Sequence, residues 1–184
     1  MLDVPIELDR DGRGRAKRSG EENLLAEILD WSEVLVLSGD VPMLRSETAS
    51  KLIAFHHEHN ATATVLTALL PDATGYGRIV RDSLGNVIAI VEHRDASAEQ
   101  RSIKEINSGI YVFDRDQLFS GLKQITPNND QKEYYLTDVF GYFWRNKFAV
   151  QAVPAENPLE IQGINTVAQL EEARSVMGEL PSKS

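Results

Sequence analysis

The residues of this chain that are best suited to chemistry follow directly after one apolar run. Residues 34–37 are four consecutive apolar residues, and Ser38, Gly39 and Asp40 come next. Such a run is typical of a short strand buried on both faces in the middle of a parallel sheet. Ligands of open α/β sheets bind outside the carboxyl ends of strands, where a carboxylate can hold Mg²⁺ and, through it, phosphate oxygens. Asp40 is therefore a candidate metal ligand, the alternative being that it only ends the strand or caps the next helix.

The composition excludes several other kinds of site. The chain has 184 residues, which suits one domain with a sizeable core. Its net charge of −9 would repel a nucleic-acid backbone, so we expect no nucleic-acid partner, although a nucleotide held through a metal ion is compatible with this charge. The absence of cysteine excludes disulfides and cysteine-ligated metal centres.

Nothing in the sequence indicates a membrane. No apolar stretch approaches the roughly 18 to 20 residues of a membrane span. The first residues lack the basic start and the apolar core of a signal peptide. We therefore expect a cytoplasmic protein with no membrane partner.

The elements that would position Asp40 alternate between strands and helices. Residues 46–57 have the pattern of a capped helix, and residues 60–70 are rich in threonine and apolar residues, as in a strand. The order strand, helix, strand predicts a βαβ unit with a right-handed crossover and a parallel pair of strands. The other expected elements are a hairpin over 78–92, strands over 104–114 and 148–153, and helices over 21–29, 116–122, 134–144 and 167–177.

The first 20 residues differ from the rest of the chain. They are rich in glycine, arginine and lysine and have no apolar period, so residues 1–20 are predicted to be a disordered or irregular leader. The alternative is a phosphate-binding patch at residues 12–15, which would need a strand before it and a helix after it. Residues 21–184 are expected to form one domain.

Six segments of the chain, taken in their order and spacing, resemble the sugar-nucleotide pyrophosphorylases. The closest resemblance is to the uridyltransferase domain of bacterial bifunctional N-acetylglucosamine-1-phosphate uridyltransferases. The segments are residues 37–42, 74–79, 91–96, 105–111, 133–139 and 163–166. The resemblance covers roughly residues 24–177, and a chance match of six segments in one order is very improbable.

This resemblance implies a fold, a reaction and a set of ligands. The fold is a Rossmann-like α/β nucleotidyltransferase fold with a mixed, mostly parallel sheet. The reaction converts UTP and N-acetylglucosamine 1-phosphate into UDP-N-acetylglucosamine and pyrophosphate. The cofactor is Mg²⁺, and the sugar phosphate or the UDP-sugar is the expected partner. The pathway is the supply of UDP-N-acetylglucosamine for peptidoglycan and cell wall biogenesis.

The resemblance also implies which residues would bind the metal. Asp40 and Asn165 would hold Mg²⁺, which takes few protein oxygens and completes its shell with phosphates and water. Ser38 and Gly39 would line the same pocket, although a tyrosine often occupies the position of Ser38 in the family. The alternative for Asn165 is a helix cap.

Three further residues would bind the sugar. The backbone at Gly77 would approach the sugar closely, Glu92 would accept hydrogen bonds from sugar hydroxyls, and the amide of Asn107 would pair with the ligand. The corresponding structural alternatives are a hairpin glycine, a strand-end charge and a cap.

The chain departs from the family pattern upstream of these segments. Family members begin with a strand and a glycine-rich loop, whose arginine and a following lysine stabilise the transition state, and then have a uridine-binding segment. Neither has a counterpart here, so we expect an N-terminally truncated domain with the sugar half of the site, without the nucleotide half and without an identified catalytic residue. We likewise expect no counterpart of the trailing β-helix of the bifunctional enzymes.

Several hypotheses therefore stay open. The chain is a uridyltransferase that is active only if something supplies the other half-site, or a non-catalytic remnant or sugar-nucleotide-binding module, or a pyrophosphorylase for another hexose 1-phosphate. The strands that normally flank residues 34–37 would also be missing. We therefore expect an open sheet edge there and self-association through it.

Overall fold

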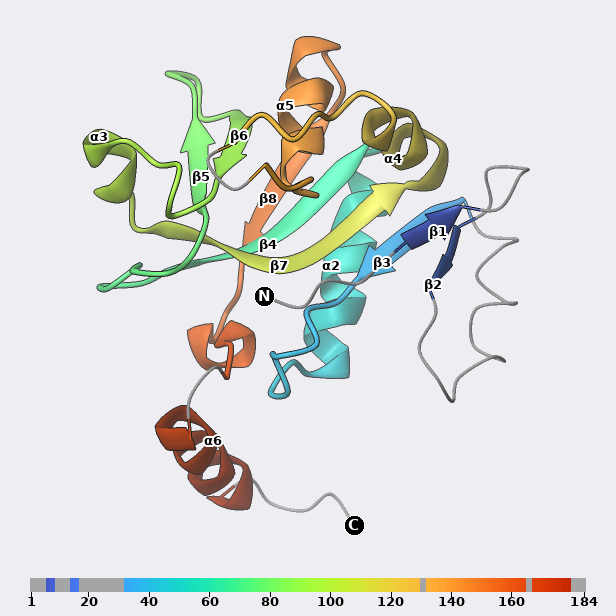
Figure 1. Cartoon of the computed structure of the whole chain (residues 1–184). Helices are drawn as coiled ribbons and strands as arrows, with labels where there is room; N and C mark the ends of the chain where they lie inside the picture. Colours follow the sequence, from blue (N-terminus) through green and yellow to red (C-terminus); the bar gives the residue numbers. More distant parts are fainter. Residues whose placement is uncertain (1–5, 9–13, 17–31, 130–131, 165–166, 180–184) are drawn as a thin grey trace.

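A mixed six-stranded sheet forms the centre of the computed structural model, which describes residues 6–8, 14–16, 32–129, 132–164 and 167–179 (Figure 1). The strands are β3 (Glu33–Val36), β4 (Ala63–Leu69), β5 (Arg78–Arg81), β6 (Val87–Val91), β7 (Glu105–Asp114) and β8 (Val150–Pro154). The order is β6-β5-β7-β4-β8, and β3 also pairs with β7. The α/β fold with a mixed sheet is thus confirmed.

The long strand β7 organises this sheet. One of its edges pairs with β4 along most of its length. Its other edge pairs with β3 at residues 111–114 and with β5 at Ile106. The loops that leave β3 and precede β5 therefore meet on the same edge of β7.

The predicted environment of residues 34–37 is wrong. Strand β3 runs antiparallel to β7 at the border of the described sheet, and the side chains of Leu35 and Leu37 are 37% and 53% exposed. Strands β3 and β4 do run in the same direction, because both are antiparallel to β7, but β7 lies between them. The prediction of a mostly parallel sheet is also wrong. The sheet is mostly antiparallel, because β4–β8 is the one parallel pair among the described strands.

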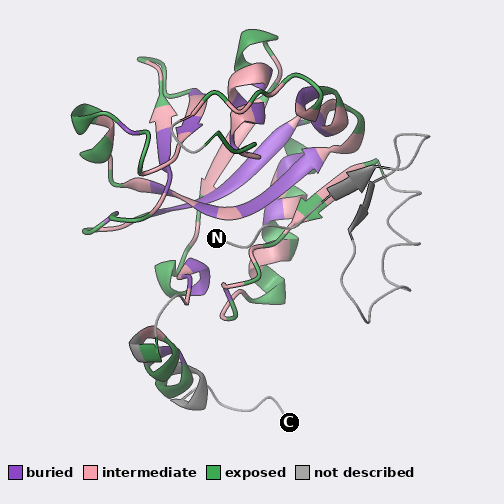
Figure 2. Ribbon diagram, in the orientation of Figure 1, coloured by how far each residue is buried: buried purple, intermediate pink, exposed green. Residues whose placement is uncertain are grey.

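Helices cover both faces of the sheet, and the alternation along β7 divides the core between them. Tyr111 and Phe113 point to the face covered by α4 (Arg115–Leu122) and α5 (Asp138–Arg145). Ile110 and Val112 belong to the second core cluster, which includes Leu52 of α2 (Ser46–Glu58). Strands β4 and β7 are consequently the most deeply buried part of the molecule (Figure 2).

The expected helices and strands are mostly present. Helix α2 confirms the predicted crossover helix, although its N-cap is Arg45 and no side chain caps it. Helix α5 begins at Asp138, later than predicted, because Asp138 and the residue after it close turns with residues 135 and 136. The remaining described helices are α3 (Ala98–Arg101), the 3₁₀ helix η1 (Pro158–Ile161) and α6 (Val167–Glu179).

Two short strands lie within the predicted leader. Strands β1 (Ile6–Leu8) and β2 (Gly14–Ala16) pair antiparallel, so these parts of the leader are regular. The helix expected over 21–29 lies outside the described residues. Among the helices of the described ranges, none has the length and apolar character needed to cross a membrane.

Candidate active site

The Asp40 carboxylate lies in a tight turn at the carboxyl end of β3. The hydroxyl of Ser38 donates a hydrogen bond of 2.7 Å to Asp40 Oδ1. The backbone N–H of Val41 closes the turn on the carbonyl of Ser38 at 3.4 Å. The short hydroxyl contact, with Asp40 half-buried, holds this carboxylate in one orientation at the sheet edge.

A bulge in β7 faces this turn. The register between β4 and β7 shifts at this point, where the Ser108 hydroxyl donates to the carbonyl of Leu66 at 2.6 Å and accepts from the N–H of Ile110 at 3.1 Å. Gly109 has a φ of +77°, and a Cβ atom there would lie only 3.1 Å from Ser38 Oγ. A glycine is therefore required both by the backbone and by the close approach of the Asp40 turn.

The side chain of Asn107 is fixed next to this bulge. Its Oδ1 accepts a hydrogen bond of 3.2 Å from the N–H of Gly109, and its Nδ2 donates to the hydroxyl of Tyr111 at 2.7 Å. Burial raises the pKa of Tyr111, which keeps the phenol neutral. The backbone N–H of Asn107 also donates to the carbonyl of Gly77 at 2.9 Å.

Gly77 and Glu92 lie against each other beyond Asn107. A Cβ atom on Gly77 would be 3.4 Å from Asn107 Cβ and 3.5 Å from Glu92 Oε2. The other oxygen, Oε1, accepts a hydrogen bond of 3.0 Å from Thr137, a buried residue just before α5. Burial raises the pKa of Glu92, with the Thr137 hydrogen bond opposing it and the charge of Asp95 adding to it.

A hollow of about 140 Å³ opens beside Glu92. Its lining is mostly polar and includes Asp95, Asp138 and Tyr135. The Tyr135 hydroxyl is a buried atom without a hydrogen-bond partner among the described residues. Burial also raises the pKa of Asp138.

The structure thus places six of the seven residues predicted for the site next to one another along one edge of the sheet. In order along the sheet edge, the residues are Asp40, Ser38, Gly109, Asn107, Gly77 and Glu92, with Gly39 inside the turn. The seventh, Asn165, lies outside the described residues. Ile164, immediately before it, donates its backbone N–H to the carbonyl of Asp40 at 2.8 Å.

The donor set at this edge is compatible with a hard cation. Asp40 offers a half-buried carboxylate, and Mg²⁺ characteristically uses one or two protein oxygens while phosphates and water supply the rest. Within the described ranges, no group of three or more histidine, cysteine, aspartate or glutamate side chains could hold a metal ion.

Sequence reasoning assigned no role to several residues that shape this edge. Thr137, Gly109 and Tyr111 lie inside segments that carried the family resemblance, and that placement was the available signal. Arg78 gave no signal of burial, yet only 2% of it is exposed. Its guanidinium donates to the carbonyl of Tyr76 and so holds the turn that precedes Gly77, while burial lowers its pKa.

The mixed α/β sheet, with its polar residues gathered where β3, β5 and β7 meet, has the fold of two solved nucleotidyltransferases. A Bacillus anthracis protein described as a glucose-1-phosphate thymidylyltransferase, solved with sucrose, matches with a TM-score of 0.60 at 18% identity, over 92% of this chain and 66% of its own. A CMP:2-keto-3-deoxy-manno-octonic acid synthetase complexed with CTP matches with a TM-score of 0.54 at 16% identity, over 85% and 66%.

The chain belongs to the nucleotidyl transferase family, whose profile matches residues 12–157. It is 49% identical over 145 residues to the bifunctional protein GlmU of Pelotomaculum thermopropionicum, covering 79% of this chain and 32% of that protein. It is 45% identical over 175 residues to the GlmU of Streptomyces avermitilis, covering 95% and 36%. The chain thus spans about a third of the length of these relatives, and they confirm the family resemblance predicted from the six segments.

Proposed function

We propose that this chain forms the sugar-binding half of a Mg²⁺-dependent UDP-N-acetylglucosamine pyrophosphorylase site. The observation that carries the proposal is the row of neighbouring polar residues and glycines from Asp40 to Glu92. It joins a strand-end carboxylate, suited to a phosphate-bound cation, to a carboxylate and an amide suited to sugar hydroxyls. In the reaction, a phosphate oxygen of N-acetylglucosamine 1-phosphate attacks the α-phosphorus of UTP, and pyrophosphate leaves.

Glu92 accepts hydrogen bonds from the sugar in this proposal. Its two oxygens are differently placed, because Thr137 engages Oε1 while Oε2 is the oxygen nearer to Gly77. A half-buried carboxylate held by one donor is pre-oriented, so a hydroxyl of the ligand meets an acceptor that need not be ordered on binding.

Gly77 leaves room for the sugar beside Glu92. The φ of Gly77 is not in the left-handed region, and a Cβ atom would make only ordinary contacts of 3.4 Å or more. Neither the backbone nor the surrounding protein therefore demands a glycine. Close approach of a ligand to the backbone, next to the fixed amide of Asn107, accounts for the residue.

Asp40 and Asn165 hold Mg²⁺ in the proposed site. The ion, when bound, neutralises the charge on the phosphate oxygens and orients them for the transfer. The protein orients the Asp40 carboxylate for the ion, because the Ser38 hydroxyl donates a hydrogen bond of 2.7 Å to it. As a cytoplasmic enzyme of UDP-N-acetylglucosamine synthesis, the protein would supply cell wall biogenesis.

The test is release of pyrophosphate from UTP and N-acetylglucosamine 1-phosphate with Mg²⁺, using the purified chain. Since the chain supplies only the sugar half of the site, we expect it to bind UDP-N-acetylglucosamine with Mg²⁺ and to release little or no pyrophosphate. Asp40→Ala should weaken this binding, and Asp116→Ala, at an exposed carboxylate on α4, should leave it unchanged. Turnover that is lost in Asp40→Ala would contradict the half-site, and a folded chain that does not bind UDP-N-acetylglucosamine would contradict the sugar site. Equal or faster reaction with another hexose 1-phosphate would reassign the sugar.

A further inference from the structure

Two segments of the chain that meet at Asp40 are joined at both of their ends. At one end, the N–H of Ile164 donates to the carbonyl of Asp40 at 2.8 Å. At the other end, Arg45 Nε donates to Glu160 Oε1 at 2.8 Å. Residues 40–45 and residues 160–164 therefore form a closed ring, in which a shift of either segment at one end is passed to the other end.

Glu160 is an unusual residue for this position, because its side chain is only 4% exposed. Both of its oxygens are engaged from α2: Arg45 donates to Oε1 through Nε and Nη2, and Thr48 donates to Oε2. Burial by itself raises the pKa of Glu160, but the hydrogen bonds from Arg45 and Thr48 outweigh it and the pKa is lowered. The carboxylate is thus charged and held from two sides.

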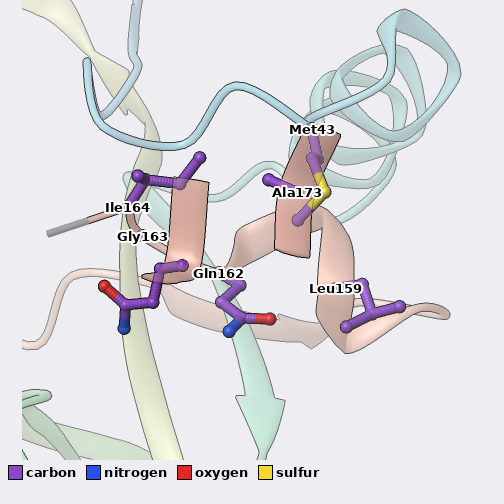
Figure 3. Close-up of a pocket in the computed structure, with 7 residues that line it drawn as sticks. Met43, Leu159, Gln162, Gly163, Ile164 and Ala173 are labelled. Atoms are coloured by element: carbon purple, nitrogen blue, oxygen red, sulfur yellow. The ribbon is translucent and has the colours of Figure 1, made fainter. Parts of the chain in front are cut away.

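Several other parts of the molecule pack around the ring. Arg45 occupies the N-cap position of α2, but its side chain extends to η1 instead of capping its own helix. Val41 and Ile161 belong to the same buried core cluster. Figure 3 shows Met43, in the segment after Asp40, close to Ala173 of α6, and both line one small hollow with Gly163 and Ile164.

We propose that Glu160 is a positioning residue that sets the place of the Asp40 carboxylate and thereby the affinity of the site for a divalent cation. This inference rests on the function proposed above. Glu160 does not itself contact the ligand: it acts through Arg45 and Thr48 on one side of the ring and through Ile164 on the other. Groups that hydrogen-bond a metal ligand directly typically change metal affinity by about tenfold to a hundredfold when removed, and Glu160, one step further from the ion, should have a smaller effect.

The chain offers a matched control for this proposal. Lys51 Nζ and Glu156 Oε1 form an ion pair of 2.6 Å that also joins α2 to the segment around η1. Both side chains are largely exposed, at 64% and 73%, and the pair lies outside the ring. Glu156→Gln therefore removes a bridge between the same two parts of the molecule without touching the Asp40 turn.

The test compares Glu160→Ala, Glu160→Gln and Glu156→Gln with the unchanged chain. Binding of Mn²⁺ in the presence of UDP-N-acetylglucosamine is followed by electron paramagnetic resonance, and amide hydrogen exchange is followed over residues 40–45 and 160–164. We expect Glu160→Ala to weaken Mn²⁺ binding several-fold, up to about tenfold, and to speed exchange in the ring. Glu160→Gln, which keeps one acceptor oxygen, should weaken Mn²⁺ binding less. Glu156→Gln should change neither the Mn²⁺ affinity nor the hydrogen exchange.

Unchanged Mn²⁺ affinity in Glu160→Ala, or an equal loss in Glu156→Gln, would overturn the proposal. If Glu160→Ala does not fold, the same comparison is made between Glu160→Gln and Glu156→Gln, which have the same change of charge. If the unchanged chain binds no Mn²⁺, the proposed function fails, and the exchange of the Ile164 amide alone decides whether Glu160 holds the Asp40 turn.

Discussion

The hydroxyl of Thr137 donates a hydrogen bond of 3.0 Å to the carboxylate of Glu92, a residue 45 positions earlier in the chain. This contact joins the residue before α5 to the residue after β6. Burial raises the pKa of Glu92, and the charges of Asp95 and Asp138 act in the same direction. The Thr137 hydroxyl opposes them, so it favours the ionised form that can accept hydrogen bonds from a sugar.

Replacing Thr137 should therefore change the pH dependence of ligand binding. Thr137→Val keeps the shape but removes the donor, so the pKa of Glu92 rises further and binding of UDP-N-acetylglucosamine is lost at a higher pH than in the unchanged chain. Titration calorimetry over a pH series measures the shift. Glu92→Gln is the control, because it should weaken binding and remove the loss of binding at low pH. If Thr137→Val and the unchanged chain lose binding at the same pH, Thr137 does not control the ionisation of Glu92.

The same carboxyl should leave a signature in stability. Because the pKa of Glu92 is raised in the folded state, the folded chain binds this proton more tightly than the unfolded chain does. The stabilising contribution is fully present below the ordinary glutamate pKa and is lost as the pH rises through the raised value. Glu92→Gln should therefore gain stability relative to the unchanged chain from acid toward neutral pH, as measured by urea unfolding. A difference independent of pH would contradict the raised pKa.

Adding a methyl group at Gly77 should weaken ligand binding without changing the stability of the fold. The contacts it would make are ordinary, so Gly77→Ala should change the free energy of unfolding by less than about 1 kcal/mol. Binding of UDP-N-acetylglucosamine should fall at least several-fold, because the added Cβ occupies the space beside Glu92 Oε2. Parallel thermal unfolding and calorimetry would check both. A variant that binds normally would return Gly77 to a purely structural role.

Adding a methyl group at Gly109 should, in contrast, lower the stability of the fold. There φ is +77° and the Cβ would lie 3.1 Å from Ser38 Oγ, so we expect Gly109→Ala to cost about 1–2 kcal/mol of stability. The displaced Ser38 should also release Asp40, weakening Mn²⁺ binding. Denaturant unfolding of Gly109→Ala beside Gly77→Ala makes the comparison, and equal stability of the two variants would contradict the bulge geometry.

The sequence predicted local features of the fold correctly, but not features that depend on contacts between distant residues. The hairpin β5–β6 and helix α2 were predicted because turn residues and apolar periodicity act within a few residues. The position of β3 was not, because an apolar run is compatible with the centre or the border of a sheet, and only the pairing with β7 decides between them. That pairing joins residues far apart in the chain.

The same distinction holds for the site. Asp40 was predicted from its place after an apolar run, and Asn107 and Glu92 from the family resemblance. The bulge that brings them together depends on a register shift between β4 and β7 that no local pattern encodes. Glu160 carries no signal in sequence, because an isolated glutamate is usually solvated. Its partner Arg45 lies 115 residues away, so its burial is visible only once the chain is folded.

The border strand β3 supports the predicted self-association. Among the described residues, β3 pairs only with β7, and Leu37, the residue after the strand, is 53% exposed. Unpaired strand edges with apolar side chains favour pairing with a second chain. We therefore expect a concentration-dependent dimer in sedimentation velocity, and Leu37→Glu should shift it toward monomer by placing a charge at the contact. Leu84→Glu is the matched control, since Leu84 is 85% exposed in the β5–β6 turn and away from this edge. If the chain is monomeric at all concentrations, or if both variants dissociate it equally, association does not use this edge.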